Sequence, residues 1–222
     1  MQRIDKTLLL SSEYKQWEES MTESHRQYNS SNNKYYYDVV MNLLHCQRGV
    51  CAYTEISLCD EEYYKIECWK EGKYQISKPE FSGALDHFDP SLKKSKGWLW
   101  NNFFIVQKDI NDKHKRNQPV NDILKPDSDT YSPFTLLEYD ERLHIFIANT
   151  DLDELIQSQI NTMIETLGIN LSWVTKKRKN HLRQIIEKVN LGGSWQQEAA
   201  NNYQFFTAFE MCRKKLQTQE NQ

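Results

Sequence analysis

Four polar residues near the middle of the chain combine types and spacing that could support chemistry. They lie within the segment ALDHFDPSLKKSKGWLWNNFFIVQKDINDKHK, residues 84–115, and are Asp86, His87, Asn102 and Asn111. Imidazole has an ordinary pKa of about 6.5, so a His side chain can take a proton from water near neutral pH. Carboxylate and amide oxygens are hard ligands of the kind that Mg²⁺ accepts. The segment therefore offers the residue types of acid–base and metal-ion chemistry.

The elements around these residues must bring them together. We expect a short apolar strand, a loop rich in Lys, Ser and Gly, a second apolar strand and a polar helix, at residues 84–88, 91–97, 103–106 and from about 109 onward. Asp86 and His87 are neighbours on the first strand, so their side chains leave opposite faces unless the strand end bends. Each residue taken alone is more often structural. Four matches at fixed spacing, framed by these elements in order, favour a functional site.

The spacing His-x14-Asn-x8-Asn, from His87 through Asn102 to Asn111, resembles the motif of the HNH (ββα-metal) nucleases in the variant whose last His is replaced by Asn. The resemblance implies that His87 is the general base, which takes a proton from the water that attacks a phosphodiester. It implies that Asp86 and Asn111 supply oxygens to one divalent ion, Mg²⁺ or Mn²⁺. Asn102 would then hold the His87 strand and ring in place.

Basic residues near the motif are expected to contact phosphate. In the HNH family a Lys often follows the last ligand by three positions, where this chain has His114 with a Lys on either side. Either the cationic contact has moved by one residue, to Lys115, or His114 is a weak third metal ligand. Lys93 and Lys94 lie in the loop inside the motif, and this position favours phosphate binding. A second basic group, residues 176–183, is expected to form a solvated helix face.

Wider stretches of the chain are similar to the PtuB-type HNH proteins of Septu antiphage systems and their retron-associated relatives. The stretches are RGVCAYTE at 48–55, LDHFDP at 85–90, ILKPDSDTYSPF at 123–134 and INTMIETLGINLSWVTKKR at 160–178. Proteins of this type work beside an ABC-like ATPase, PtuA. The resemblance therefore implies a PtuA-type partner, a nucleic-acid substrate and, through the ATPase, a retron reverse transcriptase with its msDNA.

A structural zinc is not expected. Many HNH modules of this kind hold a zinc ion with two Cys-x-x-Cys pairs, whose positions here are occupied by Cys51 with Thr54 and by Gln107 with Ile110. One thiolate cannot close a tetrahedral site, so we expect Cys51 to pack as a small apolar group. Cys46, Cys59 and Cys68 could in principle substitute, but their spacings match no common zinc motif. The five cysteines, in a chain without an evident export signal, are expected to be reduced.

Composition limits the surface and the location. The 222 residues carry a net charge of -3, which argues against a surface that is cationic throughout, so contact with nucleic acid must be local or shared with a partner. No apolar run reaches the roughly 18 residues that a membrane span requires. The first ten residues lack the apolar core and cleavage site of a signal peptide, and a cytoplasmic protein is expected.

The predicted fold class is α+β, with a ββα-metal nuclease centre flanked by helices. We expect a helical segment at 1–48, broken by NSSNN at 29–33, a nuclease core with hairpins at 49–150 and a helical segment at 151–222. The aromatic residues of the flanks exceed what a ββα centre needs to bury, so some are expected at an interface with the ATPase. They are Tyr35, Tyr36, Tyr37, Phe205, Phe206 and Phe209.

The predicted function is metal-dependent cleavage of phosphodiester bonds by the effector subunit of an antiphage complex. Two alternatives stay open. One is an effector of a retron-type system that cleaves RNA, such as tRNA. It stays open because no feature of the sequence indicates whether the site distinguishes RNA from DNA by the 2′-hydroxyl. The other is a non-cleaving adaptor that binds the ATPase and nucleic acid through a decayed HNH fold. An adaptor has no need of Asp86, His87 and Asn111 together, so their presence favours cleavage.

Overall fold

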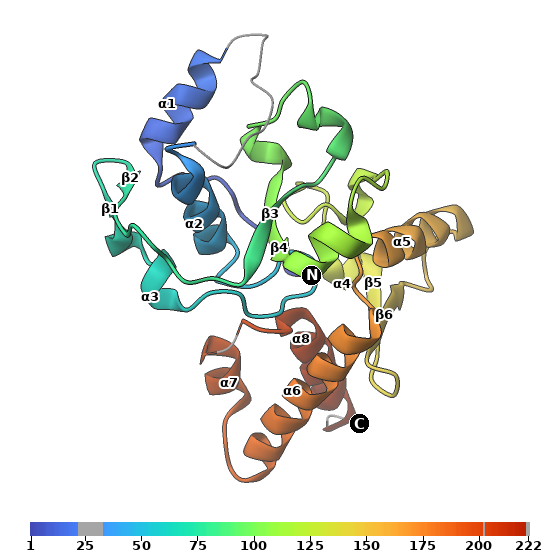
Figure 1. Ribbon diagram of the computed structural model, residues 1–222. Coiled ribbons are helices and arrows are strands. Elements are labelled where there is room, and N and C mark those ends of the chain that lie inside the picture. The colour runs from blue at the N-terminus through green and yellow to red at the C-terminus, as the bar shows by residue number, and fades with distance from the viewer. Residues whose placement is uncertain (22–32, 202, 221–222) are drawn as a thin grey trace. The chain divides into compact units, whose positions relative to one another are not determined.

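The structure is a computed structural model that describes residues 1–21, 33–201 and 203–220 (Figure 1). The chain forms two compact units. The motif unit comprises residues 4–52 and 57–120, and the C-terminal unit comprises residues 1–3, 53–56 and 121–222. Helices and short antiparallel sheets occur in both units, so the fold class is α+β, as predicted.

The two units divide the chain differently from the segments expected at 1–48, 49–150 and 151–222. The helices before residue 48 share a unit with the ββα region because α2 packs on β4. The hairpin at 137–148 belongs instead with the C-terminal helices, because α5 packs on β6 and α8 on β5. Tertiary packing of apolar faces, rather than sequence order, sets these boundaries.

The motif unit carries the following elements. Its helices are α1 (Ser12–Ser20), α2 (Tyr36–Cys46) and α3 (Glu61–Tyr64), with 3-10 turns at Ile66–Cys68, Pro90–Lys93 and Trp100–Asn102. Its strands form two hairpins, β1 (Trp69–Lys70) with β2 (Lys73–Tyr74) and β3 (Gly83–His87) with β4 (Phe103–Gln107). A π-helix, Ile110–Lys115, follows β4 directly. The order strand, strand, helix around the motif is the one expected from the sequence.

Strand β4 is the centre of the motif unit. Residues 103–106 (FFIV) have no exposed surface, and this continuous apolar run is typical of a strand covered on both faces. Antiparallel pairing sets Asp86 opposite Phe104 and His87 opposite Phe103. The side chain of Gln47, just after α2, donates to the Ile105 carbonyl and accepts from the Ile105 amide, each at 2.8 Å. On the edge of β4 that does not pair with β3, the backbone groups of Ile105 thus have hydrogen-bond partners, and the strand is fixed to the end of α2.

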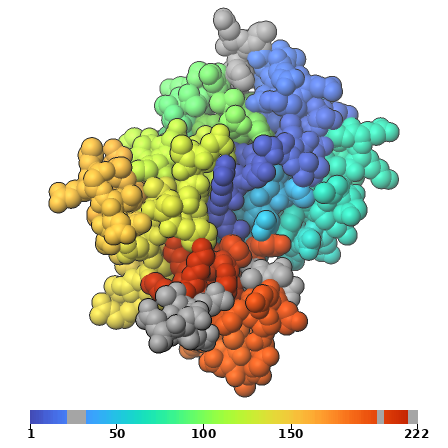
Figure 2. Space-filling model, turned by 180° about the vertical axis from the view of Figure 1, so that it is seen from behind, coloured from blue at the N-terminus to red at the C-terminus, as the bar shows by residue number. Residues whose placement is uncertain are grey.

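The N-terminal part of the motif unit packs onto the same structure. Helix α1 lies beside the β1–β2 hairpin, where the Glu13 amide donates to the Gly72 carbonyl at 3.3 Å and Trp69 Nε1 donates to Ser11 Oγ at 2.9 Å. Figure 2 shows the blue N-terminal segment adjoining the teal hairpin segment. Residues 6–11, expected to be helical, have no regular secondary structure, and the Asn42 side chain accepts from the Leu10 amide at 2.7 Å. Most of the expected break at 29–33 lies outside the described residues.

The C-terminal unit contains a hairpin and a group of helices. They are a 3-10 turn at Asp122–Leu124, α4 (Pro133–Leu136), β5 (Leu137–Asp140) paired with β6 (Ile145–Ala148), α5 (Glu154–Thr166), α6 (Ser172–Asn190), α7 (Trp195–Asn201) and α8 (Phe206–Glu220). The Asp153 side chain caps α5 by accepting from the Ile156 amide at 3.0 Å. Gly168 has φ +68 after the last turn of α5, where it ends the helix.

The sequence after residue 194 predicts one last helix, to about residue 216, but the structure has two helices there. Phe205 has φ +54, which a helix cannot continue through, and its amide donates to the Glu55 carbonyl at 3.1 Å. Phe205 and Phe209 are buried within their own unit, so they are not among the aromatic side chains that could contact a partner. Tyr35 is also buried, whereas Tyr37 is exposed.

Residues 50–76 are rich in Tyr, Val, Ile and Thr, a composition that predicts a small hairpin or meander. The structure has only the two-residue strands β1 and β2 in this stretch, because α3 and a 3-10 turn occupy residues 61–68. All five cysteines are free thiols. Cys51 is fully buried, as expected, and its sulfur accepts a hydrogen bond from the Gln107 amide at 3.3 Å. In the described part of the chain, no helix has the length and apolar character needed to cross a membrane.

Candidate active site

The ββα region of the motif unit forms a small cavity of about 170 Å³. Asp86 and His87, at the end of β3, border it together with Asn111 from the π-helix. Three of the four motif residues therefore share one cavity, although Asn111 lies 24 positions after His87 in the sequence. Although Asp86 and His87 are adjacent on a strand, both reach it. The other polar residues on its wall include Lys93, Asp112 and Arg116.

The imidazole of His87 is held in one orientation. Its Nε2 lies 2.9 Å from the Gly97 carbonyl oxygen. Since a carbonyl oxygen only accepts, Nε2 carries the proton and the lone pair of the neutral ring is on Nδ1. The ring also meets Phe103 edge to face, with 4.9 Å between ring centres. Sequence reasoning missed Gly97, because a backbone carbonyl leaves no signature in the residue types.

Burial lowers the pKa of His87 to about 4, and the positive charges of Lys93 and Lys115 act in the same direction against the opposing effect of the Gly97 hydrogen bond. The ring is therefore neutral at pH 7, which is the form that can accept a proton. A low pKa also makes the ring a weak base. His87 consequently needs a water molecule whose own acidity is raised.

Asp86 forms a buried ion pair with Lys115. The Lys115 ammonium has no exposed surface and lies 3.0 Å from Asp86 Oδ2, 3.2 Å from Asp86 Oδ1 and 2.8 Å from the His87 carbonyl oxygen. We had expected Lys115 to contact a phosphate of the substrate. The structure argues against that role, because the ammonium already neutralises a buried carboxylate that would otherwise be costly to hold.

Asn102 does not border the cavity but fixes the chain beside it. Its Oδ1 accepts from the Asp89 amide at 2.8 Å, and its Nδ2 donates to the Asp89 carbonyl at 2.9 Å. Its own carbonyl accepts from the Phe88 amide at 2.8 Å. Asn102 therefore clamps the turn that follows His87, in agreement with the expected support of the strand. The His87 ring itself is held by Gly97 rather than by Asn102.

The remaining predicted residues divide by position. Lys93 borders the cavity, while Lys94 is exposed and does not. His114 is half-buried and is not on the cavity wall, so its expected role as a third metal ligand has no geometric support. Arg116 and Asn117, which border the cavity, were missed. The only signal for them was the turn-forming stretch at 117–119 (NQP).

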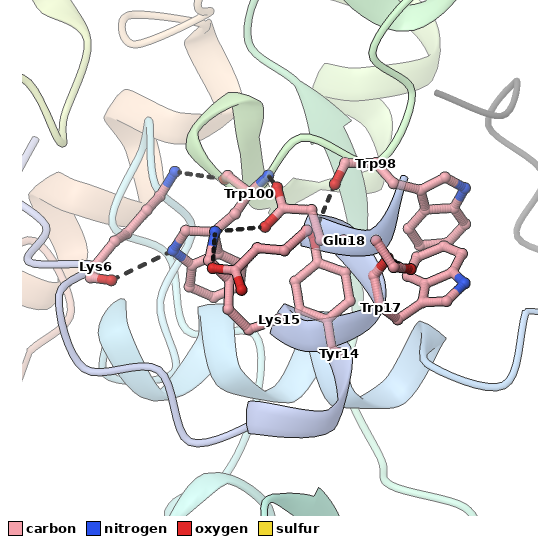
Figure 3. A network of polar contacts seen from close by, with 9 residues as sticks. Lys6, Tyr14, Lys15, Trp17, Glu18, Trp98 and Trp100 are labelled. Carbon is pink, nitrogen blue, oxygen red and sulfur yellow. Dashed lines mark hydrogen bonds and ion pairs between the residues drawn. The ribbon is translucent and has the colours of Figure 1, made fainter. Parts of the chain in front are cut away.

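The loop that carries Gly97 is anchored to α1 by the network in Figure 3. The Glu18 carboxylate accepts from the Trp100 amide at 2.8 Å and pairs with Lys15 at 2.8 Å. The Tyr14 hydroxyl donates to the Trp98 carbonyl at 2.7 Å. Since Gly97 precedes Trp98, helix α1 positions the carbonyl that orients His87. The N-terminal helix is in this way part of the support of the site.

The donor set suits a hard divalent ion. Asp86 and Asn111 supply a carboxylate and an amide oxygen beside one cavity, and Mg²⁺ is commonly held by one or two such ligands together with water. No group of three or more His, Cys, Asp or Glu side chains is placed to hold a metal within the described ranges. An ion at this cavity would therefore depend on Asp86, amide oxygens and water, a set that favours Mg²⁺ or Mn²⁺ over softer metals.

The geometry and the sequence motif are what identify this site. The motif predicted that Asp86, His87 and Asn111 act together, and all three border one cavity. Two comparisons test the wider relationship. Neither a family model nor a curated protein matches the chain.

Proposed function

We propose that this protein is a metal-dependent endonuclease of the HNH type, in which His87 activates the water that attacks a phosphodiester bond. The observation that carries the proposal is that Asp86, His87 and Asn111 border one cavity, which Lys93 and Arg116 make more positive. A neutral base, two hard oxygen ligands and cationic side chains are what hydrolysis of a phosphodiester requires.

In this mechanism His87 accepts the proton of the attacking water at Nδ1. The Gly97 carbonyl keeps the proton on Nε2, so the ring stays in the productive tautomer, and after transfer the same carbonyl stabilises the imidazolium. A divalent ion held by Asp86 and Asn111 would supply charge stabilisation at the phosphate oxygens and acidify bound water. Asn102 keeps the β3 end and the following turn rigid.

The biological setting is proposed from the sequence resemblance alone. The protein would act in the cytoplasm as the PtuB-like effector of an antiphage complex, beside a PtuA-type ATPase and, in a retron-type system, its reverse transcriptase and msDNA. The substrate is DNA or RNA. A non-cleaving adaptor is the competing function, and it is less favoured because the three motif residues are positioned together.

Cleavage assays test the mechanism. The protein, alone and co-purified with its ATPase, is incubated with plasmid DNA and with tRNA in Mg²⁺, in Mn²⁺ and in EDTA. We expect cleavage that EDTA abolishes and that His87→Ala lowers by about 10² to 10⁴-fold. His114→Ala, a change of the same kind beside the cavity, is the control and should retain most of the activity. Full activity of His87→Ala would remove this mechanism, and binding without cleavage would favour the adaptor.

Size-exclusion chromatography of the two co-expressed proteins tests the partnership. We expect one complex that His87→Ala leaves intact, because the contacts should lie outside residues 83–115. Tyr37→Ala, which truncates an exposed aromatic side chain on α2, is the first interface variant to examine. Separate elution of the two unmodified proteins would show that the partner is wrongly assigned.

A further inference from the structure

Arg116 adopts a backbone conformation that its residue type disfavours. It has φ +51 and ψ −121, and the Gln118 amide donates to the Lys115 carbonyl at 3.0 Å. These values describe the second position of a type II′ turn, which Gly normally occupies because a Cβ is crowded there. The chain thus places a large cationic residue where a small one is favoured. Residues held in such conformations concentrate at functional sites.

The neighbouring structure holds this turn in place. The residue before it, Lys115, is buried and bonded to Asp86, so the chain cannot relax on that side. The Arg116 amide donates to the Asn111 carbonyl at 3.1 Å, which closes the end of the π-helix. Asn111 is itself a residue of the cavity. The conformation of Arg116 is therefore tied to the two predicted metal ligands.

Arg116 also differs in charge pairing from the lysines of the same helical region. Lys108 pairs with Asp112 at 2.7 Å and Lys113 with Asp109 at 2.8 Å. Lys115 pairs with Asp86. Arg116 is exposed, borders the cavity and has no side-chain hydrogen bond or ion pair with any residue in the described part of the chain. Its guanidinium is thus available to a ligand.

We infer that Arg116 is a substrate-binding residue whose guanidinium takes the phosphate oxygens of a nucleic-acid backbone at the His87 cavity. A guanidinium matches two phosphate oxygens in one plane and keeps its charge at any physiological pH. Asn117, next to it on the cavity wall, adds an amide donor. The inference rests on the proposed function and names the side chain that positions the substrate. Lys115, which the sequence offered as a phosphate contact, is instead engaged in the buried ion pair with Asp86.

The backbone of Arg116 supplies a test that separates binding from folding. Arg116→Gly removes the side chain and suits the turn, so its Tm should stay the same or rise by about 2 to 4 °C. Its affinity for a short oligonucleotide should fall by about tenfold, which is the loss of one charge-assisted contact. The slope of log affinity against log salt should become smaller by about one, because one phosphate contact is lost. Arg116→Asn, also compatible with positive φ, should behave alike.

Binding is measured by fluorescence anisotropy on the full-length chain carrying His87→Ala, so that cleavage does not consume the probe. Matched DNA and RNA oligonucleotides form the two arms, and the arm with the higher affinity identifies the substrate class. Lys113→Ala is the matched control, since it removes a cation that is already paired on the same helix. It should change the affinity by less than about twofold.

The outcomes separate the two proposals. Unchanged affinity in Arg116→Gly, or an equal loss in Lys113→Ala, overturns the role of Arg116. Loss of affinity in Arg116→Gly without any cleavage by the protein that retains His87 supports Arg116 and rejects the nuclease. Cleavage with an unchanged KM in Arg116→Gly rejects Arg116 and retains the nuclease. Absence of binding to either oligonucleotide by the parent protein, both alone and co-purified with its ATPase, overturns both.

Discussion

At the scale of single residues, the ion pair between Asp86 and Lys115 places the strongest constraint on the site. Both side chains are almost without exposed surface, and the Lys115 ammonium also bonds to the His87 carbonyl. A buried pair of this kind adds little net stability compared with apolar residues of the same size, but removal of one partner is costly. The pair therefore fixes the positions of Asp86 and His87 relative to the π-helix.

Lys115→Met should lower the free energy of unfolding by about 3 to 5 kcal/mol, because it leaves the buried Asp86 carboxylate without its counter-ion. The double variant Asp86→Asn with Lys115→Met should be less destabilised than the sum of the two single variants. Urea unfolding of all four proteins measures this, with Lys113→Ala as a control from an exposed pair. Strictly additive effects would contradict a direct coupling of the two side chains.

The same residues show how far the sequence predicts the site. Motif spacing was sufficient to group Asp86, His87 and Asn111, because a hairpin followed by a helix brings those positions together. It was not sufficient for Lys115, whose role depends on the direction of one buried side chain. Gly97 and Arg116 act through a carbonyl and through positive φ, which residue types do not reveal.

At the scale of elements, helix α6 corrects the interpretation of the second basic group. The group was expected to be solvated, yet Arg178 is buried and donates to the carbonyls of His144 and Ile169, each at 2.8 Å. Arg178 follows Val174 and precedes Leu182 by four residues each, so helical periodicity places it on the buried face. The many basic residues of this group favoured a solvated face, whereas the four-residue spacing from Val174 and Leu182 indicates that Arg178 is buried. Burial lowers the pKa of Arg178 to about 10, and it remains charged at neutral pH.

Arg178→Lys should lower the free energy of unfolding by about 1 to 3 kcal/mol, because the compact ammonium lacks the planar fork with which Nη1 and Nη2 of the guanidinium reach the two carbonyls. It should also lose the stacking of the planar guanidinium on Phe146. Lys179→Ala, an exposed change on the same helix, is the control. Equal stability of the two variants in thermal and urea unfolding would show that Arg178 is not a structural residue.

His181, one turn further along α6, gives a prediction for pH. Burial lowers its pKa below the usual 6.5, helped by the charge of Lys188, while a hydrogen bond to the backbone of Gln204 and the charge of Glu198 oppose the shift. The unfolded chain then binds a proton more readily than the folded chain. This contribution to stability is complete above about pH 6.5 and is lost as the pH falls toward the lower, folded pKa.

His181→Phe should therefore lose less stability than the parent protein between about pH 7.5 and pH 5.5. The aromatic ring keeps the packing against Phe205 and removes a buried Nε2 that has no hydrogen-bond partner in the described structure. Urea unfolding at the two pH values gives the comparison, and measurements at the higher pH, where the imidazole is neutral, control for packing. Parallel losses in the two proteins would exclude His181 as the source.

At the scale of the whole molecule, every candidate site residue belongs to the motif unit. No described residue of the C-terminal unit borders the cavity, and the core of this unit contains Phe205 and Phe209, two of the aromatic side chains considered for a partner interface. Sequence periodicity predicted the helices of this unit well, apart from the division between α7 and α8. The division of the chain into units was not predictable in the same way, since it depends on which apolar faces meet.

The pairing of the Lys115 ammonium with Asp86 bears on whether the protein needs a metal ion to fold. The chain carries its own cation at the position where a catalytic ion would bind, so the interior is electrically balanced as soon as the polypeptide has folded. Folding would then not depend on a metal ion, because the Lys115 ammonium already balances the charge of the Asp86 carboxylate. We expect EDTA to abolish cleavage while leaving the thermal unfolding curve of the purified protein in place, whereas a protein that requires metal for folding would melt at a lower temperature.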